Sequence, residues 1–135
     1  MKTYRKEQDT MSKAIFTEKA PAPVGPYSQA VEAGGFVFCS GQIPLDAETG
    51  DTEGSDICSQ TEKVCENISN LLSAAGLSFE NVVKTVCYLS DMADFQKFNE
   101  VYAGYFVSEP ARSCVAVRTL PKNVMVEIEV TAARG

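Results

Sequence analysis

The sequence predicts an α+β fold in which a mixed β-sheet carries two helices on one face. Two separate segments repeat apolar residues at helical spacing, and several short segments are rich in β-branched and aromatic residues. Their order along the chain is hairpin, helix, strand, helix, strand, strand. With 135 residues, 44% of them hydrophobic, the chain is expected to form one domain around one core.

The first predicted element is a β-hairpin. Residues 28–33 and 36–40 are typical of strands, and Gly34-Gly35 between them supplies the positive φ angles that a tight turn requires. A loop that contains Pro44 and Gly50 follows. The second strand is apolar on both alternating sides, which is typical of a strand that is buried on both faces.

Two amphipathic helices and a strand are predicted next. Residues 55–75 have a helical apolar period, and Gly76 stands where a C-terminal cap is expected. Residues 81–89 predict a valine-rich strand, and Asp91 or Asp94 is then expected to cap a second helix. We interpret the aromatic stripe of this helix as core packing rather than as a cofactor site. The stripe consists of Phe95, Phe98, Tyr102, Tyr105 and Phe106.

Two strands that carry charged residues close the chain. Alternation puts Arg112 and Cys114 on one side of the first, and Glu127 and Glu129 opposite the valines of the second. Because the link at residues 120–123 is short, we expect the strands to be neighbours, with Arg112 beside the glutamates on one face and the valines on the other. A guanidinium near a carboxylate suits a small carboxylic acid substrate, which Arg grips through two oxygens while Glu handles a proton. The alternative is a partly exposed sheet face with ordinary ion pairs.

The pattern of apolar residues also predicts an oligomer. Several strands are apolar on both sides, but only two helices are available, and they are expected to cover one face. We therefore expect a second subunit to cover the other face, in an obligate oligomer.

Composition disfavours several classes of function. A net charge of -6 argues against nonspecific nucleic-acid binding. The five cysteines lack zinc or disulfide spacing and are interpreted as buried hydrophobes in a reducing compartment. Because the chain has no histidine, proton transfer must use Glu, Asp, Cys, Tyr, Lys or water. Residues 1–11 have no signal-peptide pattern and no window is a membrane span, so we expect a flexible extension, a single domain over residues 12–135, a cytoplasmic location and no membrane partner.

Five separated segments, spread over residues 12–133, resemble the RidA (YjgF) family of enamine/imine deaminases. The segments are residues 20–30 (APAPVGPYSQA), 40–44 (SGQIP), 94–95 with 99–102 (DF and NEVY), 110–113 (PARS) and 126–129 (VEIE). The resemblance implies a chorismate-mutase-like (YjgF-like) fold and a homotrimer with clefts between its subunits. It also implies hydrolysis of 2-iminobutanoate, 2-iminopropanoate and enamine tautomers such as 2-aminoacrylate to 2-oxo acids and ammonia, with neither a cofactor nor a metal ion.

The same resemblance assigns roles to individual residues. Arg112 falls on the arginine that binds the substrate carboxylate, and Glu127 on the residue that positions or deprotonates the attacking water. Glu129 is the weaker candidate for that second role. The other positions implied around the substrate are Tyr27, Ser40, Gly41, Asn99 and Cys114. Cys114 is expected to contribute its main chain and not to act as a nucleophile. The link at residues 106–109 is shorter than in many members of the family, which leaves the breadth of substrates open.

Three other functions remain as alternatives. The first is a non-catalytic regulator that binds 2-oxo acids or amino acids in the same cleft. The second is a ribonuclease or translation inhibitor, against which the net charge of -6 weighs. The third is a holdase-type chaperone, which requires an exposed apolar face.

Overall fold

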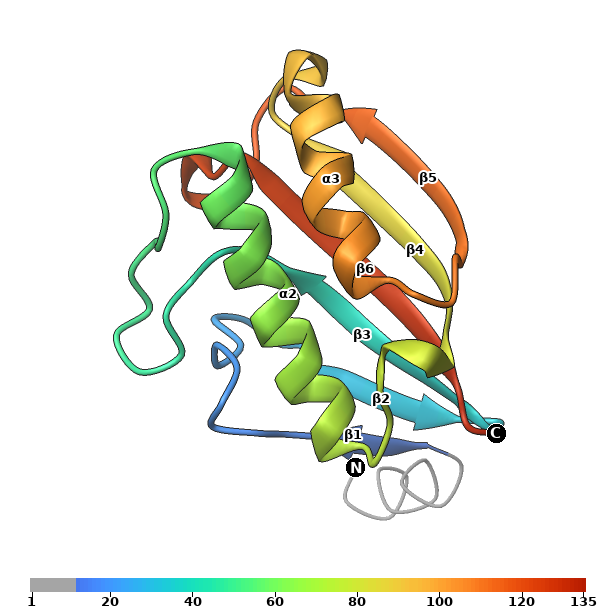
Figure 1. The fold of residues 1–135 in the computed structure, drawn as a ribbon. Coiled ribbons are helices and arrows are strands. Elements are labelled where there is room, and N and C mark those ends of the chain that lie inside the picture. The colour runs from blue at the N-terminus through green and yellow to red at the C-terminus, as the bar shows by residue number, and fades with distance from the viewer. Residues whose placement is uncertain (1–11) are drawn as a thin grey trace.

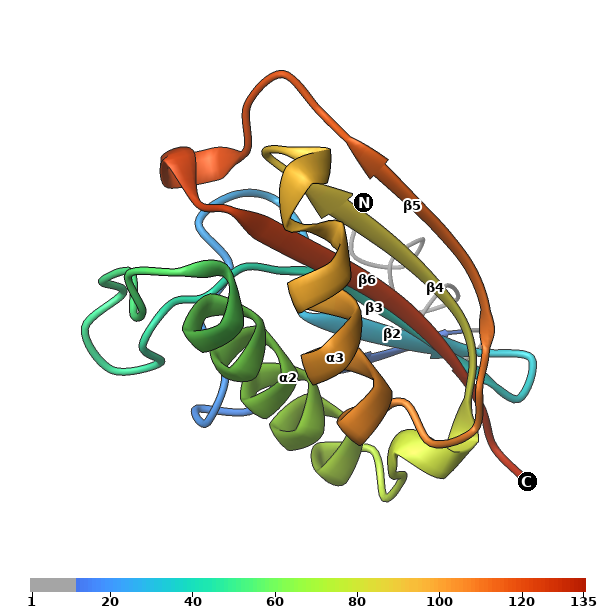
Figure 2. The same ribbon diagram turned by 45° about the horizontal axis from the view of Figure 1, so that its top comes forward.

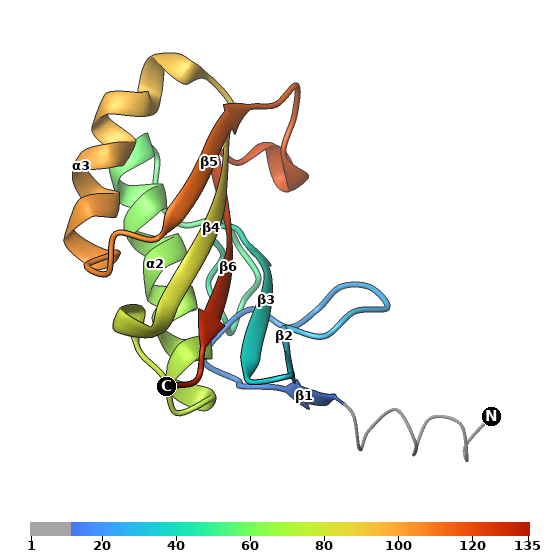
Figure 3. The same cartoon turned by 90° about the vertical axis from the view of Figure 1, so that its right-hand side faces the viewer.

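The structure is a computed structural model that describes residues 12–135, so the expected extension at residues 1–11 lies outside the described residues. Its centre is a six-stranded sheet with the order β1-β2-β3-β6-β4-β5. Two helices, α2 and α3, lie side by side on one face of this sheet (Figures 1 and 2). Within residues 12–135, Figure 3 shows no α-helix on the other face. The predicted mixed sheet with both helices on one face is therefore confirmed.

The elements follow the chain in this order. The strands are β1 (Lys13–Ile15), β2 (Ala30–Ala33), β3 (Phe36–Gln42), β4 (Val82–Leu89), β5 (Ala111–Ala116) and β6 (Val126–Ala133). The α-helices are α2 (Ile57–Ala74) and α3 (Phe95–Tyr105), and the short 3-10 helices are η1 (Phe79–Asn81), η2 (Met92–Asp94) and η3 (Pro121–Asn123). Neither α-helix of the described part combines the length and the apolar character needed to cross a membrane.

The predicted hairpin and helix ends are confirmed by local geometry. Gly34 and Gly35 have φ angles of 60° and 82°, which a residue with a Cβ rarely adopts, and they connect the antiparallel β2 and β3. Asp56 caps α2 by accepting a hydrogen bond from the Ser59 N–H at 2.7 Å. At the other end of α2, Gly76 follows the C-cap residue Ala75 and has a φ of 75°. The α2 helix therefore begins and ends where sequence signals place it.

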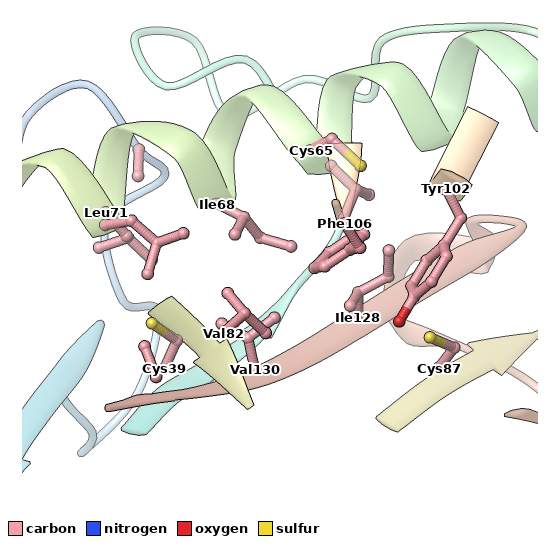
Figure 4. Packing of buried hydrophobic residues seen from close by; sticks show 14 of the residues in the cluster. Cys39, Cys65, Ile68, Leu71, Val82, Cys87, Tyr102, Phe106, Ile128 and Val130 are labelled. Carbon is pink, nitrogen blue, oxygen red and sulfur yellow. The ribbon is translucent and has the colours of Figure 1, made fainter. Parts of the chain in front are cut away.

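The core lies between the sheet and the two helices. Figure 4 shows Ile68 and Leu71 of α2 pointing at Val82 of β4 and Val130 of β6. These four side chains are almost completely excluded from solvent. The aromatic stripe of α3 contributes Phe98, Tyr102 and Phe106 to the same cluster, as predicted. Asp91 caps η2, which runs directly into α3, through a 2.9 Å hydrogen bond from the Ala93 N–H.

The expected pairing of the last two strands is wrong. β5 and β6 are not neighbours, because β4 lies between them, parallel to β5 and antiparallel to β6. The chain enters β5 after crossing over through α3, which is the usual way to join two parallel strands. The link at residues 117–125 then passes over the end of β4, where the Val117 N–H donates to the Leu89 carbonyl at 2.9 Å. The link at residues 117–125 therefore connects two strands that are separated by β4.

This order also overturns the expected common face of Arg112 and the glutamates. Thr85 of β4 pairs with both Arg112 and Val130, so Arg112 shares the helix-covered face with the buried valines. Tyr88 pairs with both Val115 and Glu127, so Glu127 projects from the opposite, open face. Within one chain, the cation and the carboxylate lie on opposite faces of the sheet.

The open face is apolar, as the two-sided strand pattern predicts. Phe36 and Phe38 are 43% and 48% exposed, and Val115 is 47% exposed. Exposed apolar side chains of this size on one face of a sheet are typical of a surface that a partner covers. The oligomer expected to cover it stays a prediction.

Candidate active site

The first group of predicted site residues surrounds Arg112, where β5 runs beneath α3. Its Nη1 donates a hydrogen bond to the Oδ1 of Asn99 at 2.7 Å. The guanidinium carbon lies 4.8 Å from the ring centre of Tyr102 and 5.5 Å from that of Phe95. The ion pairs found within residues 12–135 join Lys63 to Glu53 and Arg134 to Glu32, so neither of them neutralises Arg112. A cation held by an amide and two aromatic rings keeps its charge available for an anion.

A cavity of about 600 Å³ opens beside this guanidinium. Arg112 and Asn99 supply its polar wall, while Tyr102, Phe106 and Val107 supply apolar surface. Glu109 and Pro110, from the short link before β5, close one side. The space suits a small anion with an apolar substituent, and we call it the arginine half-site.

The second group meets on the open face, around Glu127 of β6. A cavity of about 560 Å³ brings Glu127 together with Tyr27, Ser40 and Gly41, which are three of the other predicted positions. Glu129 lines the same cavity. We call it the glutamate half-site. The structure therefore brings these four residues of the predicted site together, and their role in catalysis stays a prediction.

Gly41 is required for this arrangement. A Cβ built on Gly41 would overlap the carboxylate of Glu127, whose Cδ would lie only 2.9 Å away. A side chain at position 41 would therefore push the carboxylate aside, whereas glycine lets the β3 backbone approach it. Beside it, the Ser40 hydroxyl donates to the Ser28 carbonyl at 2.7 Å and joins β3 to the loop that carries Tyr27.

Gln29 organises that loop and was missed by the sequence analysis. Its side chain is 2% exposed. Its Oε1 accepts from the Thr17 N–H at 2.8 Å, and its Nε2 donates to the carbonyls of Thr17, Ala20 and Pro21 at 3.0, 3.1 and 2.9 Å. One buried amide thus fixes the chain that presents the half-exposed Tyr27. The only signal in the sequence is a polar residue directly before a strand.

The electrostatics of the glutamate half-site favour a proton acceptor. Burial, and then the neighbouring charge of Glu129, raise the pKa of Glu127 above its usual range. A carboxylate with a raised pKa is a stronger base at neutral pH than an exposed one. Burial also raises the pKa of the Cys114 thiol, although Arg112 opposes the effect. A thiol in that environment is a poor nucleophile, in keeping with the expectation for Cys114.

The predicted site residues therefore form two separate groups in one chain. Asn99 and Arg112 line the arginine half-site, and Cys114 lies two residues along β5 on the same face. Tyr27, Ser40, Gly41 and Glu127 line the glutamate half-site on the other side of the sheet. Opposed in this way, the two groups cannot act on one small molecule within a single chain.

Comparison with known proteins agrees with this fold. Residues 17–134 match the family described as Endoribonuclease L-PSP. The chain is 55% identical to a RutC family protein of Pyrococcus horikoshii, over 90% of this chain and 98% of the relative. It is 44% identical to a 2-iminobutanoate/2-iminopropanoate deaminase of Salmonella typhimurium, over 92% and 99% of the two chains.

A solved structure supports the same assignment. The crystal structure of E. coli TdcF with bound serine superimposes with a TM-score of 0.86 at 42% identity, and the match covers 91% of this chain and 99% of TdcF. The match in sequence and the match in fold both extend over nearly the whole described chain. The chain therefore belongs to the Endoribonuclease L-PSP family, which is the YjgF/RidA family.

Proposed function

We propose that the protein is a 2-iminobutanoate/2-iminopropanoate deaminase, which hydrolyses reactive enamine and imine acids to 2-oxo acids and ammonia. The observation that carries this proposal is the Arg112 guanidinium, which is held beside a cavity by an amide and two aromatic rings. Such a group binds a carboxylate, which every substrate of this class carries. The relative from Salmonella typhimurium is named for this activity.

The chemistry needs few groups. An iminium carbon is already electrophilic, so the protein has to hold the substrate and deliver water. Arg112 binds the carboxylate, and Glu127 accepts a proton as the water oxygen forms a bond to the C=N carbon. Glu127 then gives this proton to the nitrogen of the resulting carbinolamine. The C–N bond breaks and ammonia leaves as the C=O bond forms, while the hydroxyl proton of the carbinolamine passes to the Glu127 carboxylate. Positioning and one general base supply this step, and a general base is typically worth about 10²–10⁴-fold in rate.

We further propose that the site is assembled between subunits of a homotrimer. Arg112 and Glu127 project from opposite faces of the sheet, so a second copy is needed to bring such residues together. In this arrangement, Arg112, Asn99 and Cys114 of one subunit face Tyr27, Ser40, Gly41 and Glu127 of the next. The exposed apolar side chains of the open face, Phe36, Phe38 and Val115, are then buried in the assembly.

RNA cleavage is the second candidate function, because the matching family is described as an endoribonuclease. The net charge of -6 weighs against it, since binding to a phosphate backbone depends on Lys and Arg. The two carboxylates in the glutamate half-site also repel phosphates. A regulator that only binds small acids uses the same arginine half-site, and only turnover separates it from an enzyme.

Ammonia release from freshly generated 2-aminoacrylate tests the proposal. We expect Arg112→Ala to lower kcat/KM by about 100-fold or more, because the charge-assisted grip on the carboxylate is lost. Glu127→Gln should lower kcat by about 10²–10⁴-fold and leave the affinity for 2-oxo acids nearly unchanged. Arg118→Ala and Glu66→Gln change exposed residues outside both cavities and serve as matched controls.

Two outcomes contradict the proposal. Wild-type rates of ammonia release in the Arg112→Ala variant would show that this residue does not bind the substrate. Tight binding of 2-oxo acids by the wild-type protein without any faster ammonia release would show a binding protein instead of an enzyme.

A further inference from the structure

We propose that Tyr102 is a positioning residue for Arg112, whose aromatic face holds the guanidinium in the orientation that binds the substrate carboxylate. The inference rests on the proposed function, because it concerns the affinity of the arginine half-site for carboxylates. The three residues that carry it are Arg112, Tyr102 and Thr85, which come from β5, α3 and β4.

Tyr102 presents its ring to the cation. The guanidinium carbon of Arg112 lies 4.8 Å from the ring centre, within the range of a cation–π contact. Phe95 is more distant, at 5.5 Å, and Asn99 accepts only one guanidinium hydrogen bond, from Nη1 at 2.7 Å. The shorter of the two aromatic contacts therefore comes from Tyr102, beside the bond to Asn99.

The ring itself is fixed from two directions. The Tyr102 hydroxyl lies 2.7 Å from the Thr85 hydroxyl, which is fully buried. Phe106 stacks on the Tyr102 ring with centres 4.2 Å apart and an angle of 19° between the planes. Figure 4 shows Tyr102 reaching from α3 to the sheet, with its oxygen close to Cys87. A ring held at its oxygen and at its face has little freedom to turn.

The pairing of β4 with β5 places Thr85 next to Arg112. Thr85 is the direct partner of Arg112 in the parallel β4–β5 pair. The residue that anchors the ring thus lies beside the arginine that the ring supports, and the sheet sets the distance between them. Burial raises the pKa of Tyr102, so its hydroxyl stays protonated and the ring stays neutral at the pH of the assay.

The neutrality of the Tyr102 ring matters for the binding of an anion by Arg112. A carboxylate in place of the ring would hold the guanidinium equally well but would compete with the substrate for its charge. An aromatic face attracts the cation and leaves its N–H groups free to bind an anion. Tyr102 thereby orders a long, flexible side chain before the substrate arrives, which lowers the entropy cost of binding.

The test compares variants at position 102 by calorimetric binding of 2-oxobutanoate and of its neutral amide. Tyr102→Leu removes the aromatic face, and we expect it to raise the Kd for 2-oxobutanoate by about 5- to 30-fold. Tyr102→Phe keeps the face and should restore the Kd to within about threefold of the wild-type value. The Kd for the neutral amide should change much less than the Kd for the acid in Tyr102→Leu, because the contact with Arg112 acts through its charge.

Several outcomes overturn the inference. A purely structural role for Tyr102 would change the affinities for the acid and the amide by the same factor. Equal losses in the Phe and Leu variants would assign the effect to the hydroxyl instead of the ring. If Tyr102→Leu does not fold, Tyr102→Met gives the same comparison with a flexible side chain of similar size.

The same measurement separates this inference from the proposed function. Binding is recorded without turnover, so a protein that binds 2-oxobutanoate and releases no ammonia overturns the deaminase activity alone. A wild-type protein that does not bind 2-oxobutanoate overturns both.

Discussion

Glu127 shows how its position on a β-strand raises the pKa of a carboxylate. Strand alternation places Glu127 and Glu129 on the same face of β6, and Tyr88 of β4 pairs with Glu127. Gly41 lets the neighbouring backbone come close, which half-buries the carboxylate. Burial and the like charge both disfavour the ionised form, so both raise the pKa of Glu127. The Glu129 carboxylate is itself exposed and stays in water.

This environment predicts an effect of pH on turnover. Glu127 must be ionised to accept a proton, so kcat falls as the pH drops through its raised pKa. Glu129→Gln removes one of the two causes that raise this pKa, and the acidic limb of kcat should therefore move to lower pH. The measurement is kcat against pH for the wild type and the variant with one substrate, so that titration of the substrate affects both profiles equally.

Glu66→Gln is the control for this experiment. It removes one exposed carboxylate from α2, outside both cavities, and should leave the limb in place. A limb that moves to higher pH in Glu129→Gln, or that does not move, would show that Glu129 does not act on the base.

Among the elements, the loop at residues 17–29 depends most on one side chain. It has no regular hydrogen-bonding pattern of its own, and the buried Gln29 amide satisfies the Thr17 N–H and three carbonyls. The loop in turn presents Tyr27 to the glutamate half-site. The position of Tyr27 therefore depends on the contacts of Gln29 as well as on its own hydrogen bonds to Val24 and Gly25.

Gln29→Leu should lower the free energy of unfolding by roughly 2–4 kcal/mol, because several polar groups of the loop lose their partner. Activity should also fall, since Tyr27 is no longer held at the cavity. Urea denaturation measures the first effect, and limited proteolysis of the loop shows whether it has loosened.

Asn70→Ala is the matched control for that variant. Asn70 donates to the Lys19 carbonyl at 2.8 Å from an exposed position, so it touches the same loop from outside. Its removal should cost less than about 1 kcal/mol, because water replaces the lost partner. Equal losses of stability in the two variants would contradict the special role of Gln29.

Sequence patterns predicted the elements better than their arrangement. The hairpin turn at Gly34-Gly35 and the ends of α2 follow from local backbone preferences, which a sequence displays directly. The neighbour of β5 does not follow from local preferences. The helix α3 joins β4 to β5 as a parallel pair, and this crossover decides the strand order and leaves β6 on the other side of β4.

The same limit applies to the site. The resemblance identified Arg112 and Glu127 as site residues. Alternation shows which residues of one strand share a face, but it does not show whether residues of two unpaired strands lie on the same face of the sheet. For a related reason, Gln29 was not singled out from the sequence and Tyr102 was interpreted only as core packing. A buried amide before a strand and an aromatic in a helical stripe both look like ordinary packing until their partners, Thr17 and Arg112, are in place.

For the molecule as a whole, the β-sheet separates the two half-sites, which lie on its opposite faces. The helix side holds Arg112, the proposed carboxylate-binding group, and the open side holds Glu127, the proposed base. In a monomer the two half-sites cannot form one site. In the proposed closed ring, each subunit contributes its arginine half-site to the cleft with one neighbour and its glutamate half-site to the cleft with the other. Burial of the exposed side chains of Phe36, Phe38 and Val115 would favour association through the open face.

Mixing two inactive variants tests this arrangement. Arg112→Ala and Glu127→Gln should each be nearly inactive as pure oligomers, because every cleft lacks one of its two groups. In a closed ring of three that contains both variants, one cleft of the three combines an intact Arg112 with an intact Glu127. We therefore expect about a third of the wild-type rate per chain after co-expression with two affinity tags and purification through both, measured on 2-aminoacrylate. A mixture that stays as inactive as its parents would mean that both residues must come from one chain, or that they do not share a site, and the assembly proposed for this protein would have to be abandoned.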